Sequence, residues 1–395
     1  MIIASLIGTI LYCQAKTPIM PPAFLGKSAY EIWLDSALDG DRTNNNKGFS
    51  INGVAPKNRL PGDLRGVQSE IPDIQKLGTR IVILDGLFQI NDGEPNLDPH
   101  AGSSDDLKAT MRALEDANIL VLVRARGADE DFPNFIKKMG FCGWIGTSQN
   151  SQNQLGQVHL FNPPTNETDQ QITILDQLSN TLTKIGVENL AKMDESGSDP
   201  WGANKVVKIL ARLSQADFEE TTSLTGSRLF SRAKQSVTLA EQVLATVFFG
   251  PSTPDLLYGD EWGLTNSDKY QALDQLPDDP SRENQTIQTL VTSLISLRAN
   301  RRSISDGDFS VVYENDQDGT LVISRTYRFE TSLLCLNLSS QERQFTVSSA
   351  RLTNSGFTDL IGGASFGATI TGISVILPPE GFALLGTPAS EVPGN

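Results

Sequence analysis

The strongest constraint on the fold of this chain is an alternation between apolar, β-branched runs and segments with helical character. Residues 79–84 (TRIVIL) and 119–123 (ILVLV) are apolar almost throughout, which predicts strands covered on both faces. Residues 64–77 carry apolar side chains at helical spacing, and residues 104–117 begin with a Ser and Asp pattern typical of a helix N-terminus. Because strands that alternate with helices pair in parallel through crossovers, an α/β structure is expected.

The alternation extends over most of the chain. A short strand is expected at residues 29–34, and later elements follow it: helices at residues 168–184, 203–218, 234–249 and 283–300, and strands at residues 187–193 and 255–258. Residues 132–161 interrupt the pattern with the polar tract TSQNSQNQ. This segment is expected to be an irregular excursion rather than a layer of the sheet.

Beyond Asp306 the pattern changes to short runs of alternating polarity. These runs are FSVVY, TLVISRTY, SLLCLNL, RQFTV and ISVIL, separated by Gly, Asn and Asp. Such spacing predicts a small antiparallel sandwich over residues 306–387, followed by a disordered tail at residues 388–395.

Composition excludes several classes of function. The 395 residues contain 32 Lys and Arg against 47 Asp and Glu, a net charge of −15, which leaves no basic surface for nucleic acid. With 3 Cys and 2 His, neither a Cys/His zinc site nor a disulfide-dense scaffold can be built. No cofactor and no metal are expected.

The N-terminal residues 1–24 are interpreted as a membrane-anchor remnant and linker. Their apolar run, residues 2–12, is about half as long as the ~20 residues that cross a bilayer as a helix. A signal peptide, the outer end of a signal anchor and a buried first element all stay open. The two membrane-linked interpretations agree with three Asn-x-Ser/Thr sequons, which predict glycosylation at Asn166, Asn284 and Asn337.

Four short stretches carry a family resemblance. Residues 257–264 (LYGDEWGL) resemble the segment after the last barrel strand of the α-amylase clan of glycoside hydrolases (family 13). Residues 334–339 (LCLNLS) and 377–385 (LPPEGFALL) are similar to strands of the C-terminal domain of that clan. Residues 186–195 (GVENLAKMDE) resemble the fourth-strand segment of the heavy chains of heteromeric amino-acid transporters (solute carrier 3, CD98 type).

The resemblance implies an α/β fold in which residues 25–305 form a TIM-type (β/α) barrel, with an all-β antiparallel sandwich domain behind it. The stretch from Asp194 to Tyr258 is too short for four βα units of ~30 residues each. The barrel is therefore expected to be shortened.

The same resemblance speaks against catalysis. It places Ala191 at an arginine of the clan and Met193 at the nucleophilic aspartate, and a thioether cannot attack an anomeric carbon. Asp194 is displaced by one residue, which reverses the side-chain direction along a strand. His100 and His159 lack the Asn-His and His-Asp pairings of the clan. No catalytic residue is therefore expected.

Two acidic groups have both a functional and a structural interpretation. Asp260 and Glu261 are interpreted as an acid/base or calcium site, or as a solvated turn, and the turn is favoured. Asp194, Glu195 and Asp199 offer hard oxygen ligands for calcium, yet acidic loops are common in so acidic a chain.

The three cysteines are expected to differ. The heavy chains of the resembled family carry a Cys after the membrane segment that bridges a light-chain transporter, which implies an intermolecular disulfide at Cys13 rather than a free thiol. Cys142 (GFCGW) and Cys335 (LLCLN) lie in apolar runs and are expected to be buried thiols.

Together these expectations describe a non-catalytic heavy-chain subunit that binds and traffics a light-chain amino-acid transporter. It would be a single-pass type II glycoprotein of the cell membrane with an extracellular ectodomain, and a homodimer stays open. The alternatives are an α-glucosidase of the amylase clan, secreted or membrane-anchored, and an extracellular binding module. A convergence of carboxylates at the C-terminal mouth of the barrel would favour the glucosidase.

Overall fold

The fold is taken from a computed structural model, which describes residues 26–34, 62–91, 94–125, 132–147, 156–160, 221–223, 237–250, 253–264, 284–315, 317–348, 352, 356–362, 365–369 and 371–388. Several predicted features lie outside these residues. They are Cys13, Asn166, Ala191, Met193, Asp194 and the elements expected at residues 168–184, 187–193 and 203–218.

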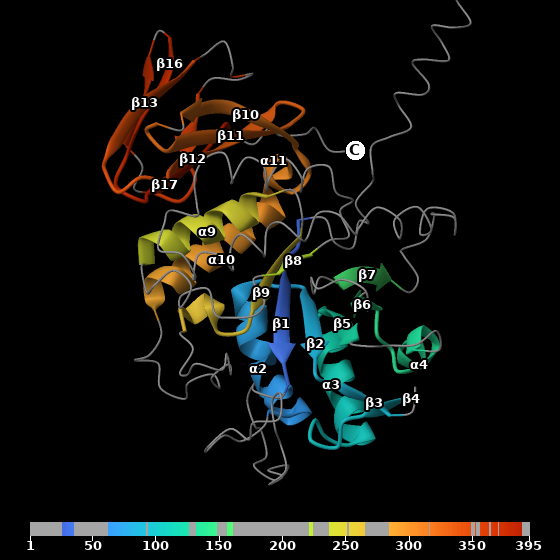
Figure 1. Cartoon of the computed structure of the whole chain (residues 1–395). Helices are drawn as coiled ribbons and strands as arrows, with labels where there is room; N and C mark the ends of the chain where they lie inside the picture. The colour runs from blue at the N-terminus through green and yellow to red at the C-terminus, as the bar shows by residue number, and fades with distance from the viewer. Residues whose placement is uncertain are drawn as a thin grey trace, which may run out of the picture.

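Among the described residues, the α/β part is built on a seven-stranded sheet in the order β7-β6-β5-β2-β1-β9-β8 (Figure 1). Its strands are β1 (Ala29–Trp33), β2 (Ile81–Asp85), β5 (Leu120–Ala125), β6 (Gly143–Thr147), β7 (Gly156–Leu160), β8 (Thr221–Ser223) and β9 (Thr253–Leu257). Neighbouring strands pair in parallel, except that β6 and β7 are antiparallel. β1 therefore lies between β2, its near neighbour in sequence, and β9, which closes the α/β part of the chain.

Helices cover one face of this sheet. They are α2 (Leu64–Leu77), α3 (Ser104–Asp116), α4 (Phe132–Lys138), α9 (Val237–Phe249) and α10 (Gln285–Asn300). The short α11 (Arg302–Asp306) follows α10 and packs instead on the C-terminal part of the chain. α2 begins where the Asp63 side chain accepts from Gly66 N at 2.6 Å and ends at Gly78, whose φ is 94°. α3 begins with a capping box between Ser103 and Asp106. Both helices confirm the sequence-based ranges.

The two faces of the sheet differ in chemistry because successive side chains of a strand point in opposite directions. On the helix-covered face, apolar side chains join the main core: Tyr30, Ile32, Val82, Leu84, Val121 and Val123. On the other face, Ile81, Ile83 and Leu122 are fully buried outside that core. This second face corresponds to the interior of a barrel.

The expectation for residues 132–161 is wrong. This segment contains α4 and two strands, and β6 pairs in parallel with β5 as a layer of the sheet. The sequence of β6, GWIGT, has two glycines and no run of β-branched residues, so it carries little strand signal. A small hairpin of β3 (Phe88–Asn91) and β4 (Glu94–Leu97) also follows β2 without having been expected.

The C-terminal part is an antiparallel sandwich, as predicted. One sheet has the order β10-β11-β12-β17-β14 and the other the order β13-β16-β15. The strands are β10 (Asp308–Asn315), β11 (Thr320–Tyr327), β12 (Glu330–Asn337), β13 (Arg343–Ser348), β14 (Thr358–Asp359), β15 (Ser365–Thr369), β16 (Gly372–Leu377) and β17 (Phe382–Gly386). Cys335, Phe345 and Val375 belong to the apolar core that these two sheets share.

Helices α9 and α10 separate the parallel sheet from the sandwich (Figure 1). Two fully buried arginines join the parts at the end of α9. Arg298 of α10 donates to Phe248 O at 2.8 Å and to Gly250 O at 2.9 Å, and Arg325 of β11 donates to Gly250 O at 2.8 Å and Gly307 O at 2.9 Å. They satisfy carbonyls that a helix C-terminus leaves without partners.

Burial lowers the pKa values of both arginines. The pKa of Arg298 falls to about 9 through burial and the nearby Arg325 charge. The pKa of Arg325 falls to about 10 through burial, which Asp306 and Asp308 partly oppose. Both side chains are therefore still cationic at neutral pH.

No helix among the described residues is long and apolar enough to cross a membrane.

We predict that Arg325→Met lowers the free energy of unfolding by about 3 kcal/mol or more, because buried carbonyls lose their charged donor. The matched control is Arg302→Met, which removes an exposed guanidinium that pairs with Asp306 at 3.0 Å and should cost only ~0.3–0.5 kcal/mol. Denaturant unfolding of both variants measures the difference. Equal losses of unfolding free energy in the two variants would contradict the role of Arg325 in joining the α/β part to the sandwich.

Candidate functional site

Four charged side chains meet on the face of the sheet that faces away from the helices. Arg124 Nε lies 2.7 Å from Glu31 Oε1 and 3.7 Å from Asp85 Oδ2, and Arg124 Nη2 lies 3.6 Å from Asp255 Oδ2. All four residues are at least nine-tenths buried. We call them the interior charge cluster: Glu31 of β1, Asp85 of β2, Arg124 of β5 and Asp255 of β9.

Strand register brings the cluster together. Leu84 pairs with Val123, so Asp85 and Arg124, the next residues along, are neighbours near the carboxyl ends of their strands. Ala29 pairs with Asp255 on the other side of β1. The carboxyl ends of the strands are where TIM-type barrels place their sites.

The sequence carries a signal for these residues. Each cluster member is a charged residue in or at the end of an apolar strand: AYEIW, IVILD, LVLVRA and TPDLL. Charged side chains are almost never fully buried unless they are paired. Two of them lie within predicted strands and two directly follow predicted strands, which points to a common polar site.

Arg124 keeps Glu31 ionised. Burial alone would raise the pKa of Glu31, but the Arg124 charge outweighs it, together with hydrogen bonds from Arg124 and from Trp33. The pKa of Glu31 therefore lies below its ordinary value. Trp33 contributes its Nε1, which donates to Glu31 Oε1 at 3.1 Å. Burial disfavours the charged form of Arg124 as well, but the three surrounding carboxyls raise its pKa.

The cluster holds three carboxyls around one cation. Arg124 lies 2.7 Å from Glu31, 3.7 Å from Asp85 and 3.6 Å from Asp255. Neighbouring carboxyls oppose one another's ionisation in a buried site, and the guanidinium charge offsets this repulsion.

A second polar group lies on the helix-covered face, where it corrects the expectation of a solvated turn at Asp260 and Glu261. These residues are only 1% and 3% exposed. They belong to a short 3-10 helix, η3 (Asp260–Trp262), which lies between two glycines with positive φ. There Glu261 Oε1 accepts a hydrogen bond from Tyr30 Oη at 2.6 Å, so the turn is held against β1.

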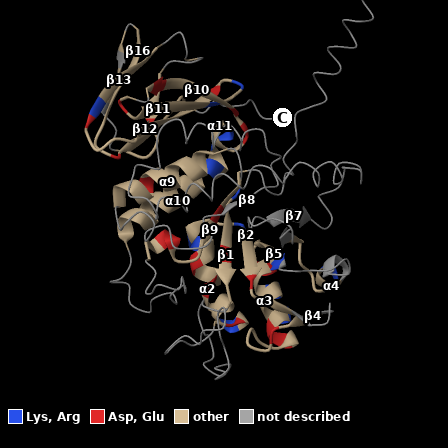
Figure 2. Ribbon diagram, in the orientation of Figure 1, with Lys and Arg blue, Asp and Glu red and all other residues tan. Residues whose placement is uncertain are grey.

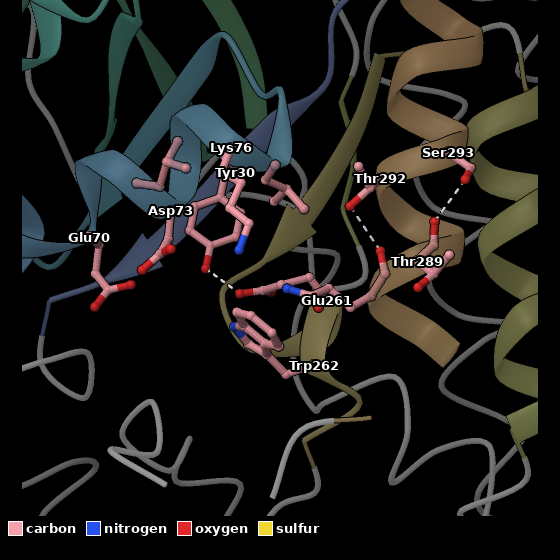
Figure 3. Close-up of a pocket in the computed structure, with 12 residues that line it drawn as sticks. Tyr30, Glu70, Asp73, Lys76, Glu261, Trp262, Thr289, Thr292 and Ser293 are labelled. Atoms are coloured by element: carbon pink, nitrogen blue, oxygen red, sulfur yellow. Dashed lines mark hydrogen bonds between the residues drawn. The ribbon is translucent and has the colours of Figure 1, made fainter. Parts of the chain in front are cut away.

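Beside η3 lies a cavity of about 280 Å³, which we call the α2–α10 groove (Figure 3). Glu70 of α2 is the most perturbed of its titratable groups. Burial, and then the neighbouring Asp73 carboxylate, raise the pKa of Glu70 to about 7. The labelled residues of the groove in Figure 3 are Tyr30, Glu70, Asp73, Lys76, Glu261, Trp262, Thr289, Thr292 and Ser293.

Of the three predicted glycosylation sites, two lie in the described residues. Asn337 is fully buried, and its Nδ2, the atom that a glycan would modify, donates to Gln341 O and Pro378 O, both at 2.7 Å. This geometry disfavours modification of the folded chain. Asn284 caps α10 through its Oδ1, which accepts from Thr286 N at 3.1 Å. Glycosylation at Asn284 and Asn166 stays a prediction.

The histidines and cysteines do not join the interior charge cluster. His100 Nδ1 pairs with Asp98 Oδ1 at 2.9 Å, and His159 lies in β7 opposite Trp144. Cys335 is fully buried, and burial raises the pKa of its thiol to about 12, as expected of an inert thiol. Cys142 is only half-buried, so its expected burial is only partly met.

The comparison with protein sequences finds a glycosidase but no matching family model. The chain is 27% identical over 208 residues to a cyclomaltodextrinase of Geobacillus thermopakistaniensis, which covers 51% of this chain and 35% of that protein. The chain thus spans about a third of the length of the curated relative that it matches.

Solved structures with the same fold carry related names. A debranching enzyme from Nostoc punctiforme matches 94% of this chain and 100% of its own, with a TM-score of 0.68 and 17% identity. An Anoxybacillus α-amylase matches 93% of this chain and 99% of its own, with a TM-score of 0.71 and 15% identity. The fold is therefore a TIM-type (β/α) barrel with a C-terminal all-β domain, and the chain is a relative of the α-amylase clan.

These findings correct the functional expectation. The named relatives are a cyclomaltodextrinase, a debranching enzyme and an α-amylase, which point to a glycoside hydrolase and not to a non-catalytic subunit. A transporter partner linked through Cys13 finds no support among them. The single-pass type II membrane protein is contradicted as well by these names.

Three finer expectations remain predictions. They are the shortening of the barrel, the domain boundaries at residues 25–305 and 306–387, and the assignment of Met193 to the nucleophile position. Met193 and Asp194 lie outside the described residues.

We predict that Arg124→Met lowers the free energy of unfolding by ~3–5 kcal/mol, because it leaves buried carboxyls without their cation. Adding Glu31→Gln to this variant should recover part of the loss. The control is Arg65→Met, whose exposed partnership with Asp106 at 2.9 Å is expected to be worth ~1 kcal/mol or less. Denaturant unfolding of the three variants measures this, and a loss for Arg124→Met no larger than the control would contradict the account.

We predict a pH-dependent gain in stability from Glu70→Gln. The folded pKa of Glu70 is raised from 4.5 to about 7, so its contribution to stability is fully present below pH 4.5 and is lost as the pH rises to about 7. Glutamine stays neutral at every pH. The melting temperature of the variant should therefore exceed that of the wild type at pH 8.5, by roughly 2 °C, and match it at pH 4.5. Glu115→Gln, which changes an exposed residue of α3, should show no such pH-dependent gain.

Proposed function

We propose that this chain is a glycoside hydrolase of the α-amylase clan that acts on α-linked glucose oligomers. One observation carries the proposal: three carboxyls from β1, β2 and β9 converge on Arg124 inside the parallel sheet, with Asp85 and Arg124 near the carboxyl ends of their strands. Burying ions costs several kcal/mol each, and apolar side chains would fill the same space as well or better. A barrel that serves only as a scaffold has no need for such a cluster, whereas a polar catalytic interior does.

Within the cluster, Arg124 and Glu31 are positioning residues. Glu31 and Asp255 both contact Arg124 and lie in the middle of their strands rather than at the strand ends. We therefore assign this pair to the floor of the site. Asp85, the last residue of β2, is the member best placed to accept a hydrogen bond from a sugar hydroxyl.

The proposed nucleophile comes from the segment that resembles the fourth barrel strand. Met193 at the clan's nucleophile position cannot react, so we assign the role to the adjacent carboxylate, Asp194. Because Asp194 is displaced by one residue, this assignment requires an extra residue in the strand, as in a β-bulge, to turn its side chain toward the sugar. Its oxygen would bond to the anomeric carbon as the glycosidic C–O bond breaks and an acid group protonates the leaving oxygen. Water would then add its hydroxyl to the anomeric carbon, release Asp194 and return a proton to the acid group.

We predict that the purified chain releases reducing sugar from maltotriose or from a cyclomaltodextrin. Asp194→Asn should lower kcat by on the order of 10³-fold, because the nucleophile is lost. The matched control is Asp105→Asn, which changes a carboxyl of α3 whose side chain is 92% exposed and should leave kcat unchanged.

The absence of any sugar release above a heat-inactivated sample, from either substrate, would contradict the proposed hydrolase. Release that persists in Asp194→Asn would retain the hydrolase and reject Asp194 as its nucleophile.

A further inference from the structure

The α2–α10 groove and the interior charge cluster lie on opposite sides of β1. Tyr30 lines the groove, while the next residue, Glu31, belongs to the cluster. Successive side chains of a strand point to opposite faces, so a ligand in the groove would not touch the interior. The groove is therefore a separate candidate site.

The floor of the groove is fixed before any ligand arrives. Tyr30 and Glu261 are each 3% exposed, and their hydrogen bond of 2.6 Å ties η3 to β1 (Figure 3). Side chains that are already ordered lose little conformational entropy on binding, which favours affinity.

One wall of the groove is polar but uncharged. α10 has a single charged residue, Arg298, which is fully buried, and Figure 2 shows this helix without charge along most of its length. Thr292 Oγ1 donates to Gln288 O at 2.9 Å, and Ser293 Oγ donates to Thr289 O at 2.8 Å. Because the hydroxyl hydrogens are used within the helix, the hydroxyl oxygens face a ligand as acceptors.

The other groups complete a mixed set of donors and acceptors. Glu70 and Asp73 of α2 supply carboxyl oxygens, and Lys76 supplies an ammonium donor. Trp262 of η3 adds an aromatic ring at one end of the groove (Figure 3). An anion would meet the carboxyls, and a cation would meet Lys76. A neutral ligand rich in hydroxyls can use both kinds of group and pack the apolar face of a sugar ring on the indole.

We propose that the α2–α10 groove binds a sugar ring of a neutral oligosaccharide, as a site without catalytic function. Its volume of about 280 Å³ is close to the lower end of the ~300–1,000 Å³ typical of small-molecule sites. The groove therefore has room for only a small part of an oligosaccharide. The proposal does not rest on hydrolysis in the barrel interior. It would place an anchoring point for a glucan chain on the outside of the barrel.

The test is isothermal titration of the full chain with maltotriose, comparing Trp262→Ala and Thr292→Val with the wild type. Trp262→Ala should weaken the binding component at the groove by at least about tenfold, and Thr292→Val by about threefold. The matched aromatic control is Phe329→Ala, because Phe329 is 80% exposed on the turn between β11 and β12 and should not affect binding. If Trp262→Ala does not fold, Thr292→Val, an exposed position of α10, decides the test.

Maltotriose affinity unchanged within twofold in the folded variants would overturn the proposal. So would Trp262-dependent binding of spermidine in place of maltotriose, which would make the groove a cation site. The results distinguish this proposal from the proposed hydrolase. If maltotriose binding depends on Trp262 but the chain releases no sugar, the groove binds sugar and the proposed hydrolase is contradicted. If the chain releases sugar but maltotriose binding does not depend on Trp262, the proposed hydrolase is supported and the sugar-binding groove is contradicted.

Discussion

The contact of Arg124 with carboxyls from three other strands is the interaction on which the rest of this site depends. Glu31, Asp85 and Asp255 come from β1, β2 and β9, and their shared guanidinium compensates their negative charge in the buried interior. The parallel register brings these residues together from different levels of the sheet, because Asp255 pairs with Ala29 and Asp85 with Trp33, two residues before and after Glu31. Burying these charged groups costs desolvation free energy, so the cluster adds little to the stability of the fold by itself. We therefore connect it with catalysis.

β1 links this interior to the outside of the barrel. Glu31 faces Arg124, and the preceding residue, Tyr30, holds Glu261 of η3 from the opposite face. η3 follows β9, the strand that pairs with β1, so one pair of neighbouring strands supports both the interior charge cluster and the α2–α10 groove. In this arrangement a glucan chain could be anchored outside the barrel while its end is processed inside.

Much of the fold could be predicted because local signals agreed with the tertiary structure. α2, α3 and β11 have the ranges that their capping residues and apolar patterns indicate. β6 was missed because its two glycines weaken the strand pattern and its place in the sheet comes from pairing with β5. The burial of Glu261 depends on Tyr30, which is distant in sequence, so no local pattern could reveal it. The clan was recognisable from short motifs, whereas the narrower heavy-chain identity rested on one stretch and is not shown by the relatives.

The most direct test of a retaining hydrolase is covalent trapping. A 5-fluoro-α-glucosyl fluoride reacts with such an enzyme to leave a glycosyl ester on its nucleophilic carboxylate, which survives long enough for mass spectrometry. The account predicts one added fluoroglucosyl group per chain, located by peptide mapping on the segment that contains Asp194. An unmodified intact mass, under conditions in which the Anoxybacillus α-amylase is fully labelled, would contradict the account.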